Sequence, residues 1–300
     1  MPPEIRPFSF ERHGAGLALI YARAFGQSGY GSAGVNIANS LRHLTFHLRN
    51  QSGKDIISQI KQEFTAGLVW QGADSVVQGG VSFVSHPLRS DTGIITNVVV
   101  DVWSRQQGIG RALMTGAIDI AHQSGAKHLA LQVDHDNVPA IRLYESLGFQ
   151  LVGEITQFER KANLPLTPQA QLRRATNGDT DELQRLARLA YPVALGCADM
   201  RDEKWFSPMI RAWLVLDGVD KKVAVAVSTQ PEDQQTQLKL LMDPKTAFDT
   251  GVGVLSTVTS KLNGKVALTL STHALIPLRV AQACGFEPIR TLRHMCLDLA

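Results

Sequence analysis

The stretch "DVWSRQQGIGRALM" (residues 101–114) joins a valine-rich run to an amphipathic segment and places two glycines one residue apart between them. The valines predict a strand over residues 93–102, and the apolar spacing after the glycines predicts a helix over 108–123. A helix start presents unpaired backbone N–H groups and partial positive charge, which together favour an anion. With no side chain at Gly108 and Gly110, a phosphate could come up to those groups.

Two arginines flank these glycines and strengthen the case for a phosphate. Arg105 in front and Arg111 behind can add charge-assisted hydrogen bonds. Two other phosphate motifs are excluded, because Leu113 stands where a dinucleotide fingerprint has a third Gly or Ala, and no Gly-Lys-Ser/Thr follows as in a P-loop. The stretch by itself predicts diphosphate binding, with a tight strand-to-helix turn that binds nothing as the alternative.

A second motif, "VDHDNVPAIRLYESLGF" (residues 133–149), follows a strand predicted over 128–134. Asn137 is placed to cap a helix predicted over 138–147, and Tyr144 lies on that helix. The phenol of a tyrosine, with a pKa of about 10, can hand a proton to a departing thiolate. Taken singly, the asparagine could be a plain helix cap and the tyrosine a core aromatic.

Together the two motifs resemble those of the GCN5-related N-acetyltransferase (GNAT) family. The family pattern Arg/Gln-x-x-Gly-x-Gly/Ala matches residues 105–110, and its pattern Asn-x-x-Ala-x-x-x-Tyr followed by Gly-Phe matches 137–149. The likeness is strong over about 93–154, looser over 1–92 and degenerate over 172–300. It implies an α/β fold in which a mostly antiparallel mixed sheet, with helices on both faces, holds acetyl-CoA between two splayed parallel strands.

The resemblance also implies a role for each residue of the motifs. Tyr144 would be the general acid that protonates the thiolate as acetyl passes directly to an amine of a small-molecule or peptide acceptor. The residues expected to bind acetyl-CoA are Val98, Val100 and Asn137 along the pantetheine arm and Arg105, Gln106, Gln107, Gly108, Ile109, Gly110 and Arg111 around the diphosphate. A non-catalytic sensor or scaffold that binds acyl-CoA is the alternative function.

The group that would remove a proton from the acceptor amine is left open. Many family members carry a Glu on the strand that ends at Val-Asp, but residues 93–101 read "GIITNVVVD", with no carboxylate before Asp101. The candidates are Asp134, His135 and Asp136, which follow the next predicted strand, and a water relay through Thr96 or Asn97.

The chain reads as two copies of one unit. "NVVVDVWSRQQGIGRALM" (97–114) pairs with "KLLMDPKTAFDTGVGVLS" (239–256), and "AIRLYESLGFQLVGE" (140–154) pairs with "PLRVAQACGFEPIRT" (277–291). The predicted domains are a catalytic GNAT domain at 1–162, a linker at 163–171 and a degenerate GNAT domain at 172–300.

The second copy lacks most of the residues that would bind or react. Gly251 and Gly253 keep the glycine pair in front of the predicted helix, but Phe248 replaces the arginine that precedes it. Ala274 and Ala281 stand where the first copy has its asparagine and tyrosine. We expect this copy to be structural or to shape the acceptor cleft, and leave open whether it holds part of a cofactor.

Composition limits the remaining classes of function. Hydrophobic residues make up 44% of the chain and charged residues 19%, with a net charge of +3, as in an ordinary globular protein. Because no run of basic residues, signal-like start or membrane-length apolar stretch occurs, neither nucleic acid nor a membrane is an expected partner. Three widely spaced cysteines favour a reducing, cytoplasmic location.

Two further expectations concern metals and assembly. His43 and His47 lie four residues apart on a predicted helix, but no HExxH pattern accompanies them, so no metal is expected. A tandem chain can form internally a contact that single-copy relatives make between subunits. The expected states are therefore a monomer with an internal pseudo-dimer or a homodimer.

Overall fold

The computed structural model describes residues 4–25, 67–85, 91–161, 170–190, 210–215, 223–230 and 235–299. The helix predicted at about 35–64 with its two histidines, Cys197 and most of the predicted linker lie outside the described residues. The chain forms two compact units. Unit 1 holds residues 1–132, 137–150 and 295–300, and unit 2 holds residues 133–136 and 151–294.

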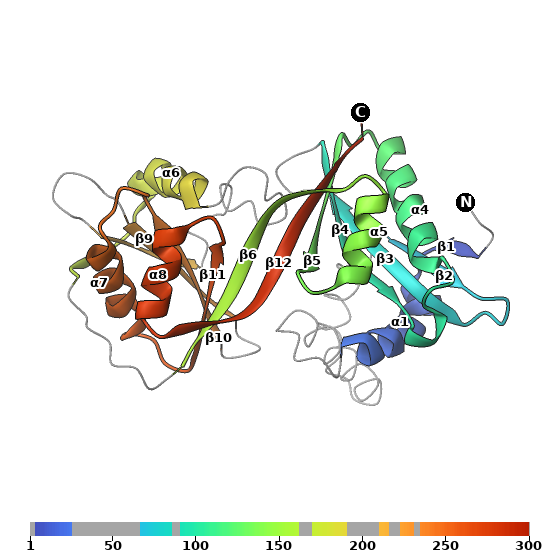
Figure 1. Ribbon diagram of the computed structural model, residues 1–300, viewed down its shortest axis with the longest axis horizontal. Coiled ribbons are helices and arrows are strands. Elements are labelled where there is room, and N and C mark those ends of the chain that lie inside the picture. The colour runs from blue at the N-terminus through green and yellow to red at the C-terminus, as the bar shows by residue number, and fades with distance from the viewer. Residues whose placement is uncertain are drawn as a thin grey trace. The chain divides into compact units, whose positions relative to one another are not determined.

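The sheet of unit 1 contains three antiparallel pairs followed by one parallel pair, between β4 and β5 (Figure 1). A parallel pair needs a crossover connection, and the α-helix that follows β4 supplies it. The last residues of β12 lie beside β5. The strands are β1 (Ile5–Pro7), β2 (Gly67–Gln71), β3 (Val77–Ser85), β4 (Thr92–Val100), β5 (His128–Asp134) and the end of β12 (Phe286–Asp298), whose residues before 295 belong to unit 2.

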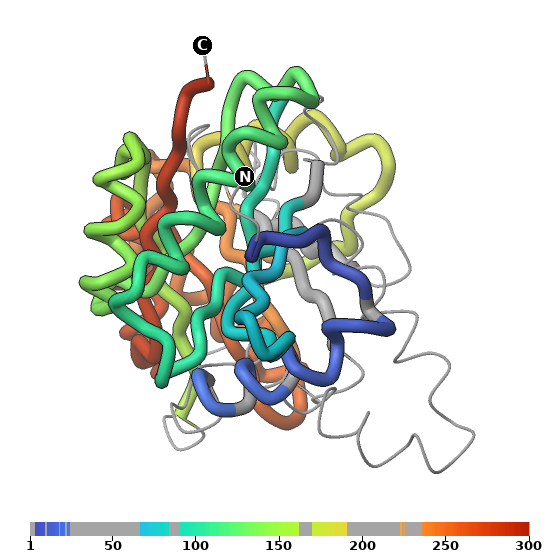
Figure 2. Tube along the Cα trace, turned by 90° about the vertical axis from the view of Figure 1, so that its right-hand side faces the viewer, coloured from blue at the N-terminus to red at the C-terminus, as the bar shows by residue number. Residues whose placement is uncertain are grey.

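Helices cover both faces of this sheet. Neighbouring strand residues point to opposite faces. A Cβ added to Gly79 would meet Leu113 of α4 (Ile109–Gln123) at 3.1 Å, whereas one added to Gly80 would meet Leu17 of α1 (Phe10–Phe25) at 2.6 Å. The two glycines thus let a helix approach β3 from each side. Figure 2 shows α4 in green and α1 in blue on either side of the cyan strands.

The helices of the two motifs begin and end close to their predicted limits. α4 runs over Ile109–Gln123, and α5 runs over Val138–Ser146 with Asn137 as its N-cap. Gly148 follows α5 with a φ of 92°, a left-handed conformation that glycine adopts readily at a helix end. Among the described residues, no helix has both the length and the apolar character needed to span a membrane.

Unit 2 repeats the pairing order of unit 1, with antiparallel pairs from β7 to β10 and a parallel pair between β10 and β11. Its strands are β6 (Gln150–Arg160), β7 (Leu172–Arg174), β8 (Ile210–Val215), β9 (Val223–Gln230), β10 (Gln235–Met242) and β11 (Lys265–Ser271). Its helices are α6 (Thr180–Ala190), α7 (Phe248–Thr259) and α8 (Leu275–Ala283), and the short 3₁₀ turn η2 (Asn177–Asp179) precedes α6. The 3₁₀ turn η1 (Val102–Ser104) lies in unit 1.

Each unit includes a strand from the opposite half of the sequence. In unit 2, β6 pairs with β11 from Ile155↔Ser271 to Glu159↔Ala267, and Phe158 belongs to the buried core of that unit. In unit 1, the Leu299 N–H donates a 2.7 Å hydrogen bond to the carbonyl of Lys127, directly before β5. The predicted domain boundaries follow the sequence repeat. The compact units differ from them, because β6 of the first copy lies in unit 2 and the end of β12 of the second copy lies in unit 1.

Candidate active site

The two parallel strands of unit 1 separate before either strand ends. Pairing runs from Thr92↔His128 to Ile95↔Leu131, but β4 continues to Val100. The recorded pairing therefore leaves the β5 side of the last part of β4 open. An open strand edge can hydrogen-bond an extended ligand as if it were a further strand. Val98 and Val100, the residues expected along the pantetheine arm, lie on this open part.

A bulge lies on β4 where the strands separate. Between the partners of Gly80 and Ser82, β4 contains one residue more than β3. Asn97 lies in this bulge with a left-handed φ of 53°, which asparagine tolerates better than most residues. The buried hydroxyl of Tyr21 on α1 donates a hydrogen bond to the carbonyl of Asn97. No motif indicated Tyr21, because its partner is 76 positions away in the sequence.

Gly108 is the N-cap of α4 and has a φ of 80°. This conformation costs other residues roughly 1–2 kcal/mol. A Cβ added to Gly108 would meet no described atom within 4 Å, so there is open space beside this cap. No side chain caps this helix start, and its first N–H groups are available to solvent or a ligand. The predicted anion site therefore has both open space and donors.

Gly110, in contrast, has a packing role. A Cβ at this position would lie 3.3 Å from Leu143 Cδ2 and 3.6 Å from Val100 Cγ2. The neighbouring Arg111 donates a 2.7 Å hydrogen bond from Nη2 to Ser146 Oγ. Leu143 and Ser146 belong to α5, so the structure brings the two sequence motifs together at the start of α4.

Of the remaining residues of the predicted diphosphate loop, some are exposed to solvent and one is buried in the core. Arg105 is exposed, and its Nε donates a 3.3 Å hydrogen bond to the Val100 carbonyl. Gln106, with a φ of 64°, and Gln107 are also exposed. Ile109 is buried in the core, so only its backbone could meet a ligand. The loop thus presents polar side chains around a helix start that an apolar side chain anchors.

The second motif places a capping group and a buried phenol on α5. Asn137 Oδ1 accepts a 3.3 Å hydrogen bond from the Ala140 N–H, which leaves the amide nitrogen outside the cap. Tyr144 is 5% exposed, and its ring centroid lies 6.1 Å from that of Phe149. Within the described part of the chain no group hydrogen-bonds its hydroxyl. Burial raises the pKa of the Tyr144 phenol above its usual value, so the proton is retained at neutral pH.

The structure argues against one of the candidate bases. Asp134 is buried and accepts hydrogen bonds of 2.5 Å from Arg290 Nε and 2.9 Å from Arg290 Nη2. Both carboxylate oxygens are thus engaged by one guanidinium, which occupies the positions where a base would accept the proton of an amine. His135 and Asp136 are exposed and remain candidates, as does a water relay at the β4 bulge.

The glycine pair of the second copy does not precede its helix. Gly251 and Gly253 lie inside α7, so their predicted place at a strand-to-helix turn is wrong. A Cβ at Gly251 would lie 2.7 Å from Met242 Cε and 2.9 Å from Val280 Cγ2. The physical reason for this glycine is therefore close packing of α7 against β10 and α8, with no turn to make.

The start of α7 is unsuited to an anion. Its N-cap is Ala247 in an extended conformation, and Asp249 places negative charge in the first turn. That charge opposes the attraction of a helix N-terminus for phosphate. Phe248, the first residue of α7, lies under the guanidinium of Arg279 at 5.4 Å from its ring centroid, so the aromatic side chain has an intramolecular partner.

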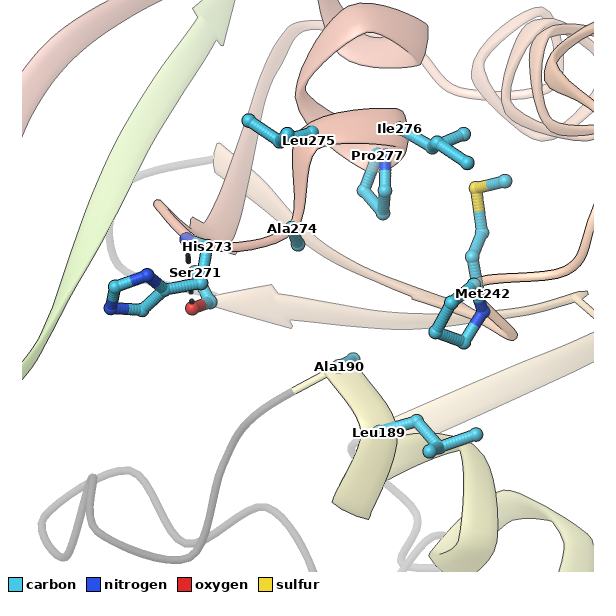
Figure 3. A pocket seen from close by; sticks show the side chains of 10 residues that line it. Leu189, Ala190, Met242, Ser271, His273, Ala274, Leu275, Ile276 and Pro277 are labelled. Atoms are coloured by element: carbon cyan, nitrogen blue, oxygen red, sulfur yellow. Dashed lines mark hydrogen bonds between the residues drawn. The ribbon is translucent and has the colours of Figure 1, made fainter.

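A cavity of about 330 Å³ lies in unit 2 where β10 and β11 separate after Lys239↔Thr269 (Figure 3). Its walls are largely apolar side chains from the last residues of α6 and β10 and the first residues of α8. Ser271 and His273 are polar members of the lining. Ala274, the N-cap of α8, lines it and offers no polar side-chain atom in the place of the first copy's asparagine. This cavity therefore lies where the two parallel strands of unit 2 separate, and Ala274 contributes no side-chain amide to it.

Comparison with known proteins supports the resemblance to the GNAT family. Residues 35–149 match the family described as "Acetyltransferase (GNAT) family". Streptothricin acetyltransferase of Streptomyces lavendulae is 39% identical over 82 residues, which are 27% of this chain and 43% of that protein. The matched stretch therefore spans less than half of this relative's length.

Two solved structures share the α/β GNAT fold along nearly the whole chain. A GCN5-related N-acetyltransferase of Sphaerobacter thermophilus has a TM-score of 0.65 at 13% identity and covers 100% of this chain and 97% of its own. A tandem GNAT protein from the clavulanic acid biosynthesis pathway has a TM-score of 0.61 at 15% identity, covering 99% and 98%. At these identities the likeness concerns the fold alone.

Proposed function

We propose that this protein is an N-acetyltransferase that moves acetyl from acetyl-CoA to an amine of a small-molecule or peptide acceptor, and that unit 1 carries the site. One observation carries the proposal. β4 separates from β5, and the next α-helix, α4, begins at a cap, Gly108, that has open space beside it. This arrangement offers hydrogen-bond donors to an extended arm along β4 and to an anion at the start of α4.

The residues present suit acetyl-CoA. The backbone of 106–111 and the dipole of α4 would hold the diphosphate, with Arg105 adding positive charge. The open edge at Val98 and Val100 would hold the pantetheine arm, and the Asn137 amide nitrogen would donate a hydrogen bond to it.

Acetyl-CoA supplies a thioester whose carbonyl carbon the acceptor amine attacks. Tyr144 suits the role of general acid because burial keeps its phenol protonated, and its hydroxyl makes no hydrogen bond to any described residue. A lysine-like amine, with a pKa of about 10.4, is mostly charged at neutral pH, so it must lose a proton first. A water at the β4 bulge, or one of the exposed side chains after β5, would accept that proton.

We assign a structural or substrate-shaping role to the second copy. An acidic first turn in α7 and an alanine at the N-cap of α8 provide neither a phosphate site nor a partner for the pantetheine arm. Ala281, at the place of the catalytic tyrosine, is fully buried in the core of unit 2. The copy therefore has no proton donor at this position.

The variant Tyr144→Phe tests the mechanism. Thiol release from acetyl-CoA would be followed with a thiol-reactive chromophore over a panel of primary amines and peptides, and acetyl-CoA binding by titration calorimetry. We expect kcat to fall by about 10²-fold or more while the Kd for acetyl-CoA stays within about twofold, because only proton transfer is lost. Full activity of the variant would refute the role of Tyr144. Acetyl-CoA binding by the wild type without thiol release on any amine would instead favour a non-catalytic sensor.

A further inference from the structure

Three side chains with metal-binding donors converge in unit 1, away from the open part of β4. His128 is the first residue of β5, and Cys296 and Asp298 lie near the end of β12. One donor atom from each lies within 4.8 Å of the other two, and His128 Nδ1 lies 2.7 Å from Asp298 Oδ1. No local sequence pattern indicates this cluster, since His128 and Asp298 are 170 positions apart.

The backbone holds these donors on one side of the sheet. Residues 296 and 298 are two apart on a strand, so their side chains point to the same face. The Leu299 N–H bond to Lys127 keeps the end of β12 in register with the start of β5. His128 also pairs with Thr92 of β4, so both sides of the cluster lie on regular strands.

We propose that His128, Cys296 and Asp298 form a Zn²⁺ site with water as the fourth ligand. A thiolate and an imidazole favour zinc and other late transition metals over Mg²⁺ or Ca²⁺, and a carboxylate completes a common ligand set. Zinc–ligand bonds of about 2.0–2.3 Å place tetrahedral donors about 3.3–3.6 Å apart. To bind the ion, His128 Nδ1 and Asp298 Oδ1 must move slightly apart from their 2.7 Å contact, and donor atoms that lie up to 4.8 Å apart must move closer together. The side chains of His128 and Asp298 are 41% and 78% exposed, which leaves them room to do so.

A bound ion would tie the last strand of the chain to β5. Binding requires the thiol of Cys296 to lose its proton and His128 to bind through an unprotonated nitrogen, so affinity should fall as the pH is lowered. An ion that binds only the folded chain also raises its melting temperature. Neither effect involves acetyl-CoA, so this inference stands apart from the proposed acetyltransferase.

The test is a titration of the full chain, freed of metal by chelation and dialysis, with Zn²⁺ alone and with Co²⁺ alone. We expect one ion per chain, a thiolate-to-cobalt charge-transfer band, and a higher melting temperature with Zn²⁺. Cys296→Ser and His128→Gln should each weaken binding at least about tenfold, since even an outer-shell partner contributes that much. Cys296→Ser should also abolish the band.

Matched controls are Cys284→Ser, a cysteine buried in unit 2, and His122→Gln, an exposed histidine on α4. Both should bind as the wild type does. Absence of stoichiometric binding by the wild type would overturn the proposal, as would unchanged binding in either ligand variant. Asp298→Asn, at a largely exposed position, gives a third independent variant should one of the others fold poorly.

Discussion

The variant Gly108→Ala separates the conformational cost of the helix start from its proposed ligand. Gly108 has a φ of 80°, and Gly125, after the other end of α4, has a φ of 81°. At both positions an added Cβ would meet no described atom within 4 Å. Gly125→Ala is therefore a control with the same backbone strain and the same absence of a steric clash.

The expected stability loss is the same for both variants. Placing alanine in the left-handed region costs roughly 1–2 kcal/mol, and no contact in the described structure adds to it. Such a loss lowers the melting temperature by a few degrees, about 2–4 °C per kcal/mol in a chain of this order of size. Thermal unfolding should therefore show two similar shifts.

Acetyl-CoA binding should distinguish the two variants. At Gly108 the new methyl group would occupy the open space beside the cap of α4, next to the N–H groups where we propose that the diphosphate lies. We expect titration calorimetry to show a Kd at least about tenfold higher for Gly108→Ala, equivalent to about 1.4 kcal/mol, and an unchanged Kd for Gly125→Ala. Equal affinities in the two variants, at equal stability loss, would refute the assignment of this helix start to the diphosphate.

Two further predictions concern charged groups. Asp134→Asn and Arg290→Met should each lower the free energy of unfolding by on the order of 3 kcal/mol, because each removes one charge of a largely buried ion pair. Their kcat values should change together, and a loss of about 10²-fold or more confined to Asp134→Asn would identify Asp134 as the base after all. Burial lowers the pKa of His294 to about 4, so this residue contributes stability above pH 6.5 that is lost as the pH falls toward 4. Urea unfolding of His294→Leu at a series of pH values should lack up to about 3 kcal/mol of that pH-dependent loss, and a pH dependence equal to that of the wild type would contradict the burial argument.

The local features of the site were within reach of the sequence. Hydrophobic periodicity located α4 and α5 to within one residue at each end, because it reports which face of each helix is buried. The cap at Asn137 was also predictable, since it depends on the residue's own side chain and its near neighbours. The same reasoning was wrong for Gly251, where the cause is a contact with Met242 across the core.

What the sequence by itself determined about this protein is the order of its strands and helices and the local conformation of two short motifs, because these follow from periodicity, capping and backbone freedom over a few residues. The tertiary structure alone decided which distant groups meet. It placed Tyr21 on the β4 bulge, engaged Asp134 with Arg290, and gathered a histidine, a cysteine and an aspartate near the start of β5. These contacts join residues 76 to 170 positions apart, and they depend on strand pairing and helix packing that no local pattern encodes.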